Sequence, residues 1–393
     1  MMSVKYAFNL PETSQPIVVV GAGAAGMGCA LAAALAGAQV VLVEKLPEFG
    51  GTVKQALIHT IGGLFDDAGE LQNQGLPAEL VERLFAASAN TEKRRIGKTW
   101  VLNVDPEVYA QVTTDWLGST NGITAFCGFE SGQVHVTDDS VSQLAISNGD
   151  FATTLKPHAV VDTTGNAEIV SQVDAGLVAE GLALGGYILQ LRGIDEDALS
   201  FPKGIGVLRE IRKAVEQGKL PQECATVWLD TGVYPDEVYA KFSVSVPDYQ
   251  QTHMQEVAAE LLSYLHELPG FGGAHIHTYG HLGVRDGGRI RGEYCLTEAD
   301  VTNGQQFDDT ACQASWPIEH WHPEKGITLE YLSPGQSYAI PLRSLKVSGI
   351  NNLWAAGKCL SAEPRAQASA RVAGTCWAMG EAVGKQLAGS WTA

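Results

Sequence analysis

Two arginines stand four residues apart in a glycine-rich stretch, a pattern that could bind a negatively charged group. Arg285 and Arg289 lie among glycines at positions 272, 273, 280, 283, 287 and 288, where the backbone can approach a ligand closely. Guanidinium groups bind carboxylates through paired hydrogen bonds, so both side chains are candidates for holding a substrate carboxylate in catalysis. The alternative is a structural role, with ion pairs to Glu293 or Glu298.

Two His-x-His pairs are candidates for proton transfer. His320 and His322 would lie on one face of a strand, as would His275 and His277. We expect His320 or His322 to carry a proton during catalysis. Two such pairs could also complete a metal site, but the sequence does not place carboxylate or thiolate partners beside them, and we expect no metal.

Three glycines predict a dinucleotide site. Gly21, Gly23 and Gly26 follow a β-branched run at 17–20 and open an Ala- and Leu-rich stretch that extends to residue 36. The first glycine allows a tight turn, the second allows close approach of a pyrophosphate, and the third allows the helix to pack on the strand. A second strand at 40–43 ends at Glu44, whose carboxylate could accept hydrogen bonds from an adenosine ribose. The pattern alone does not distinguish FAD from NAD.

Composition and charge exclude several classes of partner. The chain has 393 residues and a net charge of −18, and its longest basic run is the triplet at 93–95, so we expect no nucleic acid and no anionic membrane. The apolar stretch at 17–43 is interrupted by glycines and is typical of buried strands around a helix. The seven cysteines lie at least 17 positions apart, which excludes CxxC pairs and cluster motifs and indicates a reducing compartment, expected to be the cytoplasm.

Further segments identify a family resemblance. They are Phe49-Gly50-Gly51-Thr52, the run 159–167 with Thr164 and Gly165, the run 352–358 with Gly357, Ser369-Ala370-Arg371, the arginine-rich run 283–294, and 341–345. Together they resemble the FAD-dependent oxidoreductases with a flavin fold of the glutathione-reductase type, in the branch of fumarate-reductase-like and heterodisulfide-reductase-A-like proteins. The resemblance extends from about residue 17 to 387.

The resemblance implies an α/β fold with a Rossmann-like FAD-binding domain and a second, α+β substrate domain. The FAD-binding domain would comprise residues 1–175 and 338–393, including a β-meander after residue 132, and the substrate domain residues 176–337. The family has arginine where this chain has Lys358, and aspartate where it has Asn166. The implied FAD-binding residues are Gly21, Gly23, Ala24, Ala25, Gly26, Glu44, Lys45, Gly51, Thr52, Val134, Thr164, Gly165, Gly357, Arg371 and Val372.

The resemblance also bears on function. It implies a FAD-dependent dehydrogenase or oxidase that removes a hydride from a small metabolite to flavin N5, with Arg285 and Arg289 acting on the substrate or on the charge of the flavin. His59 lies where some relatives attach flavin covalently, but its spacing from Glu44 is longer and we expect no such link. The alternatives are a reductase supplied by NAD(P)H, with Gly204-Ile205-Gly206 as a partial second motif, and a flavoprotein that works with a partner protein in maturation. A homo-oligomer is a further expectation.

Overall fold

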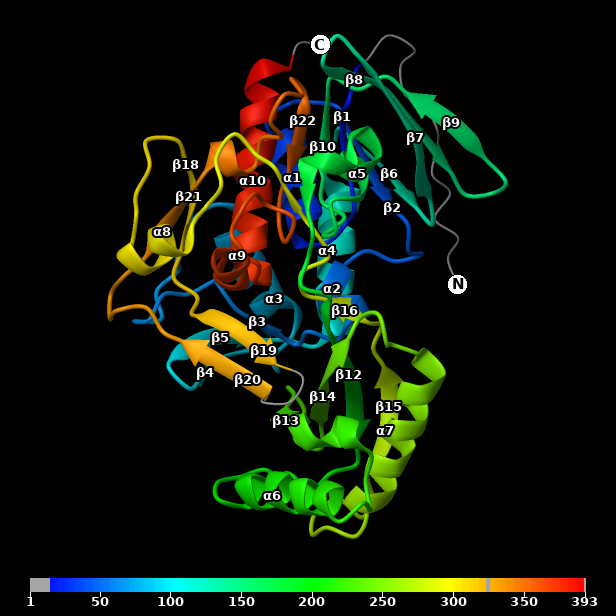
Figure 1. Ribbon diagram of the computed structural model, residues 1–393, viewed down its shortest axis with the longest axis vertical. Helices are drawn as coiled ribbons and strands as arrows, with labels where there is room; N and C mark the ends of the chain where they lie inside the picture. The colour runs from blue at the N-terminus through cyan, green and yellow to red at the C-terminus, as the bar shows by residue number, and fades with distance from the viewer. Residues whose placement is uncertain (1–14, 323–325, 392–393) are drawn as a thin grey trace.

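The centre of the computed structural model, which describes residues 15–322 and 326–391, is a parallel five-stranded sheet (Figure 1). Its strand order is β22 (Leu353–Ala355), β10 (Ala159–Asp162), β1 (Ile17–Val20), β2 (Val40–Glu44) and β6 (Ile123–Cys127). These strands are short runs of β-branched residues, and the central ones are buried on both faces, as parallel strands covered on two sides require.

Alternate residues of β1 and β2 supply two separate cores. Ile17, Val19 and Leu42 pack on the side of α1 (Ala24–Leu35) and α10 (Ala373–Ser390). Val18 and Val41 pack on the opposite side, towards the meander of β7 (Glu130–Thr137), β8 (Ser140–Ser147) and β9 (Ala152–Leu155). The period of two along each strand therefore fixes which layer each residue supports.

Helices α1 and α10 approach closely because glycine replaces a side chain at their contacts. A Cβ added to Gly380 would lie 2.0 Å from the carbonyl oxygen of Ala25, and one added to Gly384 would lie 2.4 Å from that of Cys29. The C-terminal helix is thereby held against the helix that opens the dinucleotide motif, although more than 340 residues separate their first residues.

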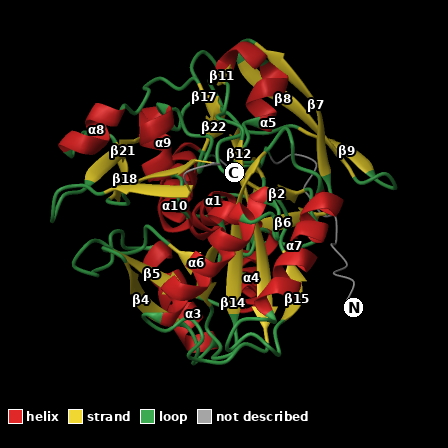
Figure 2. Cartoon of the chain, turned by 60° about the horizontal axis from the view of Figure 1, so that its bottom comes forward, coloured by secondary structure: helices red, strands yellow, loops and turns green. Residues whose placement is uncertain are grey.

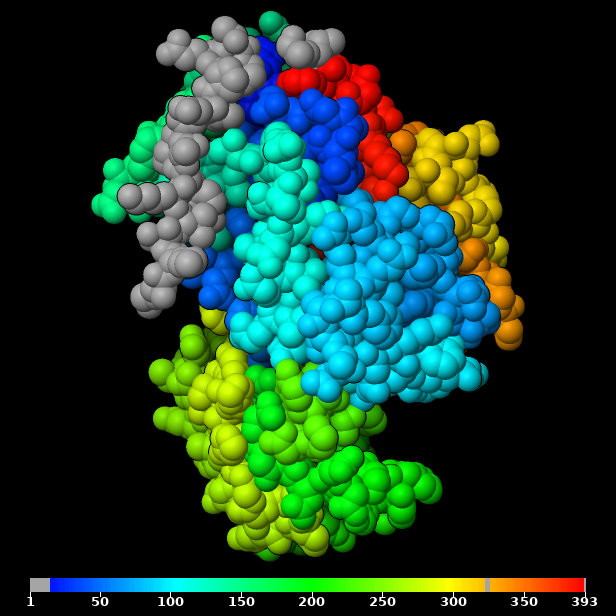
Figure 3. All heavy atoms as spheres, turned by 180° about the vertical axis from the view of Figure 1, so that it is seen from behind, coloured from blue at the N-terminus to red at the C-terminus, as the bar shows by residue number. Residues whose placement is uncertain are grey.

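A second lobe is built on an antiparallel sheet. Its strand order is β13 (Trp228–Thr231), β14 (Val238–Ser245), β12 (Leu184–Arg192) and β15 (His275–Tyr279), with β16 (Gly283–Val284) also paired to β12. The lobe includes α6 (Lys203–Glu216) and α7 (Gln251–Leu265) and has its own apolar core. Figure 2 shows α7 beside β14 and β15, and Figure 3 shows the lobe, in green to yellow-green, below the rest of the molecule.

Core packing places the edge of this lobe earlier than the expected boundary at residue 337. The antiparallel sheet ends at Val284, whereas Leu296, Val301 and Cys312 belong to the core of the first body. The physical reason is that β18 (Thr310–Ala314) pairs with β21 (Tyr338–Pro341), which brings the segment back to the side of α10.

The remaining elements connect these parts. A small antiparallel sheet of β3 (Thr60–Ile61), β5 (Thr99–Asn103) and β4 (Glu92–Ile96) lies near the second lobe, and β19 (Ile318–His322) pairs with β20 (Gly326–Glu330) as a hairpin.

None of the helices in the described ranges is long and apolar enough to cross a membrane. The other elements are α2 (Gly51–Gln55), α3 (Leu76–Ala87), α4 (Pro106–Ser119), α5 (Glu168–Val173), β11 (Val178–Ala179), β17 (Arg289–Ile290), α8 (Glu298–Asn303), α9 (Pro364–Ala370) and 3-10 turns at 175–177, 222–226 and 342–344.

Candidate active site

A cavity of about 520 Å³ opens at the carboxyl ends of β1, β2, β10 and β22. Ligands of parallel α/β sheets bind in this position, because the turns that follow the strands meet there. Most of the residues that the sequence predicts for FAD line it, namely Gly21, Gly23, Ala24, Ala25, Glu44, Lys45, Gly51, Thr52, Thr164, Gly165, Gly357 and Arg371.

Three of the predicted residues do not line this cavity, and their contact with FAD stays a prediction. Gly26 serves helix packing instead, since a Cβ there would lie 1.8 Å from the carbonyl oxygen of Gly21. Val134 packs at the meander core, because the chain passes the cavity earlier, at 129–131. Val372 precedes α10 and packs on Gly63. A Cβ added to Gly63 would lie 2.6 Å from Cγ2 of Val372.

Two glycine backbones form part of the cavity wall. A Cβ on Gly51 would lie 2.5 Å from Cα of Gly23, so the two turns touch at positions where no side chain fits between them. Gly23 is also the N-cap residue of α1 and has no side chain that could cap the helix. The first N–H groups of α1 are thus available to a diphosphate, which fits the cofactor that the motif predicts.

Glu44 is held at the rim of the cavity by backbone N–H groups. Its Oε2 accepts a hydrogen bond from Ala22 N at 2.7 Å, and its Oε1 accepts one from Leu46 N at 2.9 Å. Each carboxylate oxygen retains a lone pair, so the group can also accept ribose hydroxyls. Lys45 forms an ion pair with Glu168 at 2.9 Å across the same rim.

Asp162 is a positioning residue that the sequence reasoning missed. Buried at the end of β10, it accepts hydrogen bonds from Thr164 Oγ1 at 2.7 Å and from Ile169 N at 2.8 Å. These bonds fix the turn at 164–165 and the start of α5. Burial raises the pKa of this carboxyl group, while the same hydrogen bonds act in the opposite direction.

Lys358 takes the place of the family arginine. Its Nζ donates a hydrogen bond to the carbonyl oxygen of Val284 at 2.5 Å, and a Cβ on Gly165 would lie 2.7 Å from its Cε. Burial lowers the pKa of its ammonium group. The lysine therefore lines the cavity and joins the sheet of the first body to the second lobe.

Comparison with protein families decides the nature of the site. The model of the family described as FAD dependent oxidoreductase matches residues 16–181 and 192–390. The chain belongs to this family. The protein is therefore a FAD-dependent oxidoreductase, and its Rossmann-like sheet with the glycine turns is the FAD-binding fold.

Individual relatives of this oxidoreductase are distant or partial. A Methanosarcina barkeri protein described as an uncharacterized protein in the nifH2 5′ region is 43% identical over 63 residues, which is 16% of this chain and 31% of that protein. A geranylgeranyl bacteriochlorophyll reductase-like protein from Thermoplasma acidophilum is 12% identical, with a TM-score of 0.48, 95% of this chain covered and 77% of that one. An anhydrotetracycline hydroxylase from Streptomyces rimosus is 14% identical, with a TM-score of 0.46 and coverages of 71% and 54%.

The FAD cavity of the oxidoreductase continues to the junction of its two lobes. At this end it is lined by Gln55 and Ala56 of the first body and by residues 281–284 of the second lobe. The backbone N–H of His281 donates to Gln55 O at 2.6 Å and closes the junction. The nucleotide motif lies at the other end, so we expect the flavin ring to lie where the lobes meet.

The structure separates the two predicted arginines. Arg289 is buried and pairs with Asp286 at 3.2 Å. It also donates to the carbonyl oxygens of Ala362 and Glu180 at 2.7 and 2.9 Å, so its contacts in the structure stabilise the loop. Arg285 donates to the carbonyl oxygen of Gly185 and lies over the ring of Trp321, at 4.0 Å from its centroid. Within the described residues, neither arginine forms the alternative ion pair to Glu293 or Glu298.

The histidine pairs do not meet in one site. Glu319 contacts Arg371 and Trp321 contacts Arg285, so these two residues of β19 face the arginines. His320 lies between them in the strand and therefore points to the opposite face. It does not line the FAD cavity. Burial and Arg365 lower the pKa of His320. The side chain of His322 lies outside the described part of the structure. His275 and His277 are exposed on β15, and the described ranges contain no cluster of three or more metal-ligating side chains.

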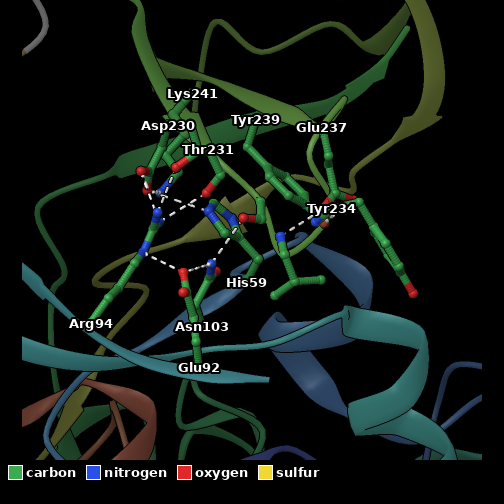
Figure 4. A network of polar contacts seen from close by, with 12 residues as sticks. His59, Glu92, Arg94, Asn103, Asp230, Thr231, Tyr234, Glu237, Tyr239 and Lys241 are labelled. Carbon is green, nitrogen blue, oxygen red and sulfur yellow. Dashed lines mark hydrogen bonds and ion pairs between the residues drawn. The ribbon is translucent and has the colours of Figure 1, made fainter. Parts of the chain in front are cut away.

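His59 lies in a buried polar network between the lobes and does not line the FAD cavity (Figure 4). Its ring stacks on Tyr239 at 3.7 Å, and its Nε2 lies 3.3 Å from Asp230 Oδ2. Asp230 also pairs with Arg94 of β4 and with Lys241 of β14, each at 2.9 Å. The network therefore links the small sheet of the first body to the antiparallel sheet of the second lobe.

The burial of His59 predicts a loss of stability in mild acid. Burial and Lys241 lower its pKa to about 4, against the opposing effect of Asp230. The unfolded histidine has a pKa of about 6.5, so between these values the unfolded chain binds a proton that the folded chain does not. The free energy of unfolding should fall as the pH decreases from about 6.5 to 4, by up to about 3 kcal/mol from this residue.

The variant His59→Phe tests this origin of the pH dependence. Phenylalanine keeps a ring against Tyr239 but cannot bind a proton, so denaturant unfolding at several pH values should show a flatter profile than that of the wild type between pH 6.5 and 4.5. Lys241 and Arg94 also hold the pKa of the Asp230 carboxyl group below this window, so its titration should add little to the slope of either protein there. Equal slopes in the two proteins would contradict the assignment.

Proposed function

We propose that this oxidoreductase is a dehydrogenase or oxidase acting on a small metabolite at the junction of its lobes. The observation that carries the proposal is the continuity of one cavity from the dinucleotide turns to a region lined by residues of both lobes. A substrate bound there would face the ring end of FAD and would be shielded from water by the second lobe. Bound FAD supplies a two-electron acceptor, taking a hydride at flavin N5.

Substrate oxidation of this kind also releases a proton. A C–H bond next to an O–H or N–H group breaks, its hydride goes to FAD, and the proton of the heteroatom needs an acceptor. Among the described histidines, His281 is the one that lines the cavity, and its backbone is held by Gln55. We therefore assign the acceptor role to His281 within this proposal.

The NAD(P)H-fed alternative gains less support. Gly204-Ile205-Gly206 lies within α6, whereas a nucleotide motif has its glycines in the turn between a strand and a helix. The sheet of the second lobe is antiparallel, and within the described ranges the parallel βαβ unit with glycine turns is that of β1 and α1. A role with a partner protein has no specific feature that favours it over a small substrate.

Anaerobic reduction of the holoenzyme tests the proposal. FAD absorbance at its long-wavelength band should be bleached in minutes by at least one member of a panel of hydroxy acids, amino acids, amines and sugars. NADH and NADPH, mixed in the same way, should bleach the band far more slowly. Rapid bleaching by NADH together with no response to any metabolite would replace this proposal with the reductase alternative.

A further inference from the structure

A second cavity, of about 540 Å³, lies between the second lobe and the β19–β20 hairpin, and we call it the outer cavity. The lobe contributes α6, the turn at 222–226 and Trp228 of β13, while the hairpin contributes Trp321 and Ile327. Figure 1 shows the hairpin above α6. None of the described residues lines both the outer cavity and the FAD cavity, so the two are separate. The volume of the outer cavity is typical of small-molecule sites.

Two indole rings line the outer cavity, one from the second lobe and one from the hairpin. Trp228 is 41% exposed, whereas Leu229 beside it is buried in the core of the lobe. Trp321 is held by two contacts: the guanidinium of Arg285 lies 4.0 Å from the centroid of its ring, and its Nε1 donates to Glu319 at 2.5 Å. A flat aromatic ligand packed on these rings would remove apolar surface from water and add aromatic stacking.

Aliphatic side chains form the rest of the apolar wall. Ile327 of β20 is 37% exposed, and Val227, next to Trp228, is buried. Val215 lines the cavity from α6 and is half-buried. The apolar wall is thus carried by strands and a helix. A preformed cavity of this kind favours a rigid, planar ligand, because a flexible chain would lose more conformational entropy on binding.

The outer cavity also carries one positive and one negative side chain. Arg212 and Glu216 stand one turn apart on α6, and both line the cavity. Within the described residues, neither has a partner of opposite charge within 4 Å. Their charges cancel, so an ionic ligand would lose hydration without gaining a net counter-charge. The cavity therefore favours an uncharged ligand, with hydrogen-bonding groups available for a polar substituent.

We propose that the outer cavity is a binding site for an uncharged planar aromatic compound with a polar substituent. The ring packs on Trp228 and Trp321, and the polar group forms a hydrogen bond with Arg212 or Glu216. The site lies outside the FAD cavity, so this proposal does not depend on the proposed reaction. The competing occupant is a second copy of the chain, and the test distinguishes the two.

Calorimetric titration of the holoenzyme with 2-naphthol at neutral pH tests the site, since bound FAD occupies the other cavity. We expect saturable binding, and we expect decahydro-2-naphthol, which has the same skeleton but no flat ring, to bind about tenfold more weakly. Trp228→Leu should also weaken the binding of 2-naphthol by about tenfold and leave the FAD content unchanged. Tyr279→Leu is the matched control, because Tyr279 is an aromatic residue of the same sheet, 40% exposed, that lines neither cavity.

Glu216→Gln supplies a variant whose expected effect has the opposite sign. The substitution leaves the positive charge of Arg212 without a compensating charge in the cavity. The anion 2-naphthoate should therefore bind several-fold more tightly to this variant than to the wild type. A general loss of folding cannot produce a gain in affinity. Unchanged binding of 2-naphthoate would contradict the assignment of the polar groups.

Other results would overturn the site as a whole. Equal binding of 2-naphthol and decahydro-2-naphthol would show that the cavity does not select a flat ring. A long-wavelength charge-transfer band that appears with 2-naphthol and is unaffected by Trp228→Leu would place the ring on the flavin instead. A dimer in sedimentation that Trp228→Leu dissociates would show that a second copy of the chain covers the cavity.

Discussion

Replacing Gly23 with alanine is expected to weaken FAD binding by about 10- to 100-fold while leaving the apoprotein as stable as the wild type. The backbone of Gly23 has a φ of −81°, which alanine adopts without strain, and the nearest atom to an added Cβ is Cα of Gly51 at 3.8 Å. The protein therefore has room for the methyl group. A diphosphate bound against the two glycine turns would clash with this methyl group, because the methyl group would fill the space that the diphosphate needs beside the backbone.

FAD titration and thermal unfolding of the apoprotein measure the two parts of this prediction. Gly206→Ala is the matched control, because no atom lies within 4 Å of an added Cβ there, and FAD affinity should stay unchanged. Gly26→Ala should behave differently from both, since its Cβ would lie 1.8 Å from the Gly21 carbonyl oxygen and would destabilise the apoprotein itself. Wild-type FAD affinity in Gly23→Ala would show that the diphosphate binds elsewhere.

Replacing Asp230 with asparagine is expected to lower the free energy of unfolding by about 3 kcal/mol at pH 7. The substitution keeps the size of the side chain and removes the charge that Arg94 and Lys241 share, which leaves two largely buried cations without a counter-charge. These cations hold the pKa of Asp230 well below its usual range, so its carboxylate stabilises the fold above about pH 4 and this contribution is lost as the pH falls further.

Denaturant unfolding against a surface control tests the importance of this network. Asp309 pairs with Arg343 at 3.0 Å, but Arg343 is about half exposed, so Asp309→Asn should cost no more than about 1 kcal/mol. The difference between the two variants isolates the effect of burial. A loss in Asp230→Asn no larger than that in Asp309→Asn would mean that the interlobe network contributes little to stability.

The FAD-binding turns could be predicted from the sequence because their signals are local. The glycines, the two strands and Glu44 occupy fewer than 30 consecutive residues, and the geometry of a βαβ unit fixes their relative positions. The positions of Val134 and Val372 depend on how the meander and α10 approach the cavity. Those approaches are set by packing, so the local sequence does not show that the cavity is lined by residues 129–131 and by Ala373 in their place.

The substrate end and the lobe boundary could not be predicted in this way. Arg285, Glu319 and Arg371 come from three separate segments, and only the pairing of β18 with β21 and the packing of β19 beside α9 bring them together. The spacing of His320 and His322 predicts a shared face of a strand, and both residues belong to β19. It does not indicate which face contacts the active site, and Glu319 and Trp321 occupy that face.

A crystal structure of the holoenzyme would show where each part of FAD lies. We expect the diphosphate against Gly23 and the start of α1, the adenosine ribose at Glu44, and the flavin ring at the junction of the lobes, within reach of His281 and Arg371. A flavin ring bound away from that junction, or a cofactor oriented with its adenosine there, would contradict the proposed position of the active site.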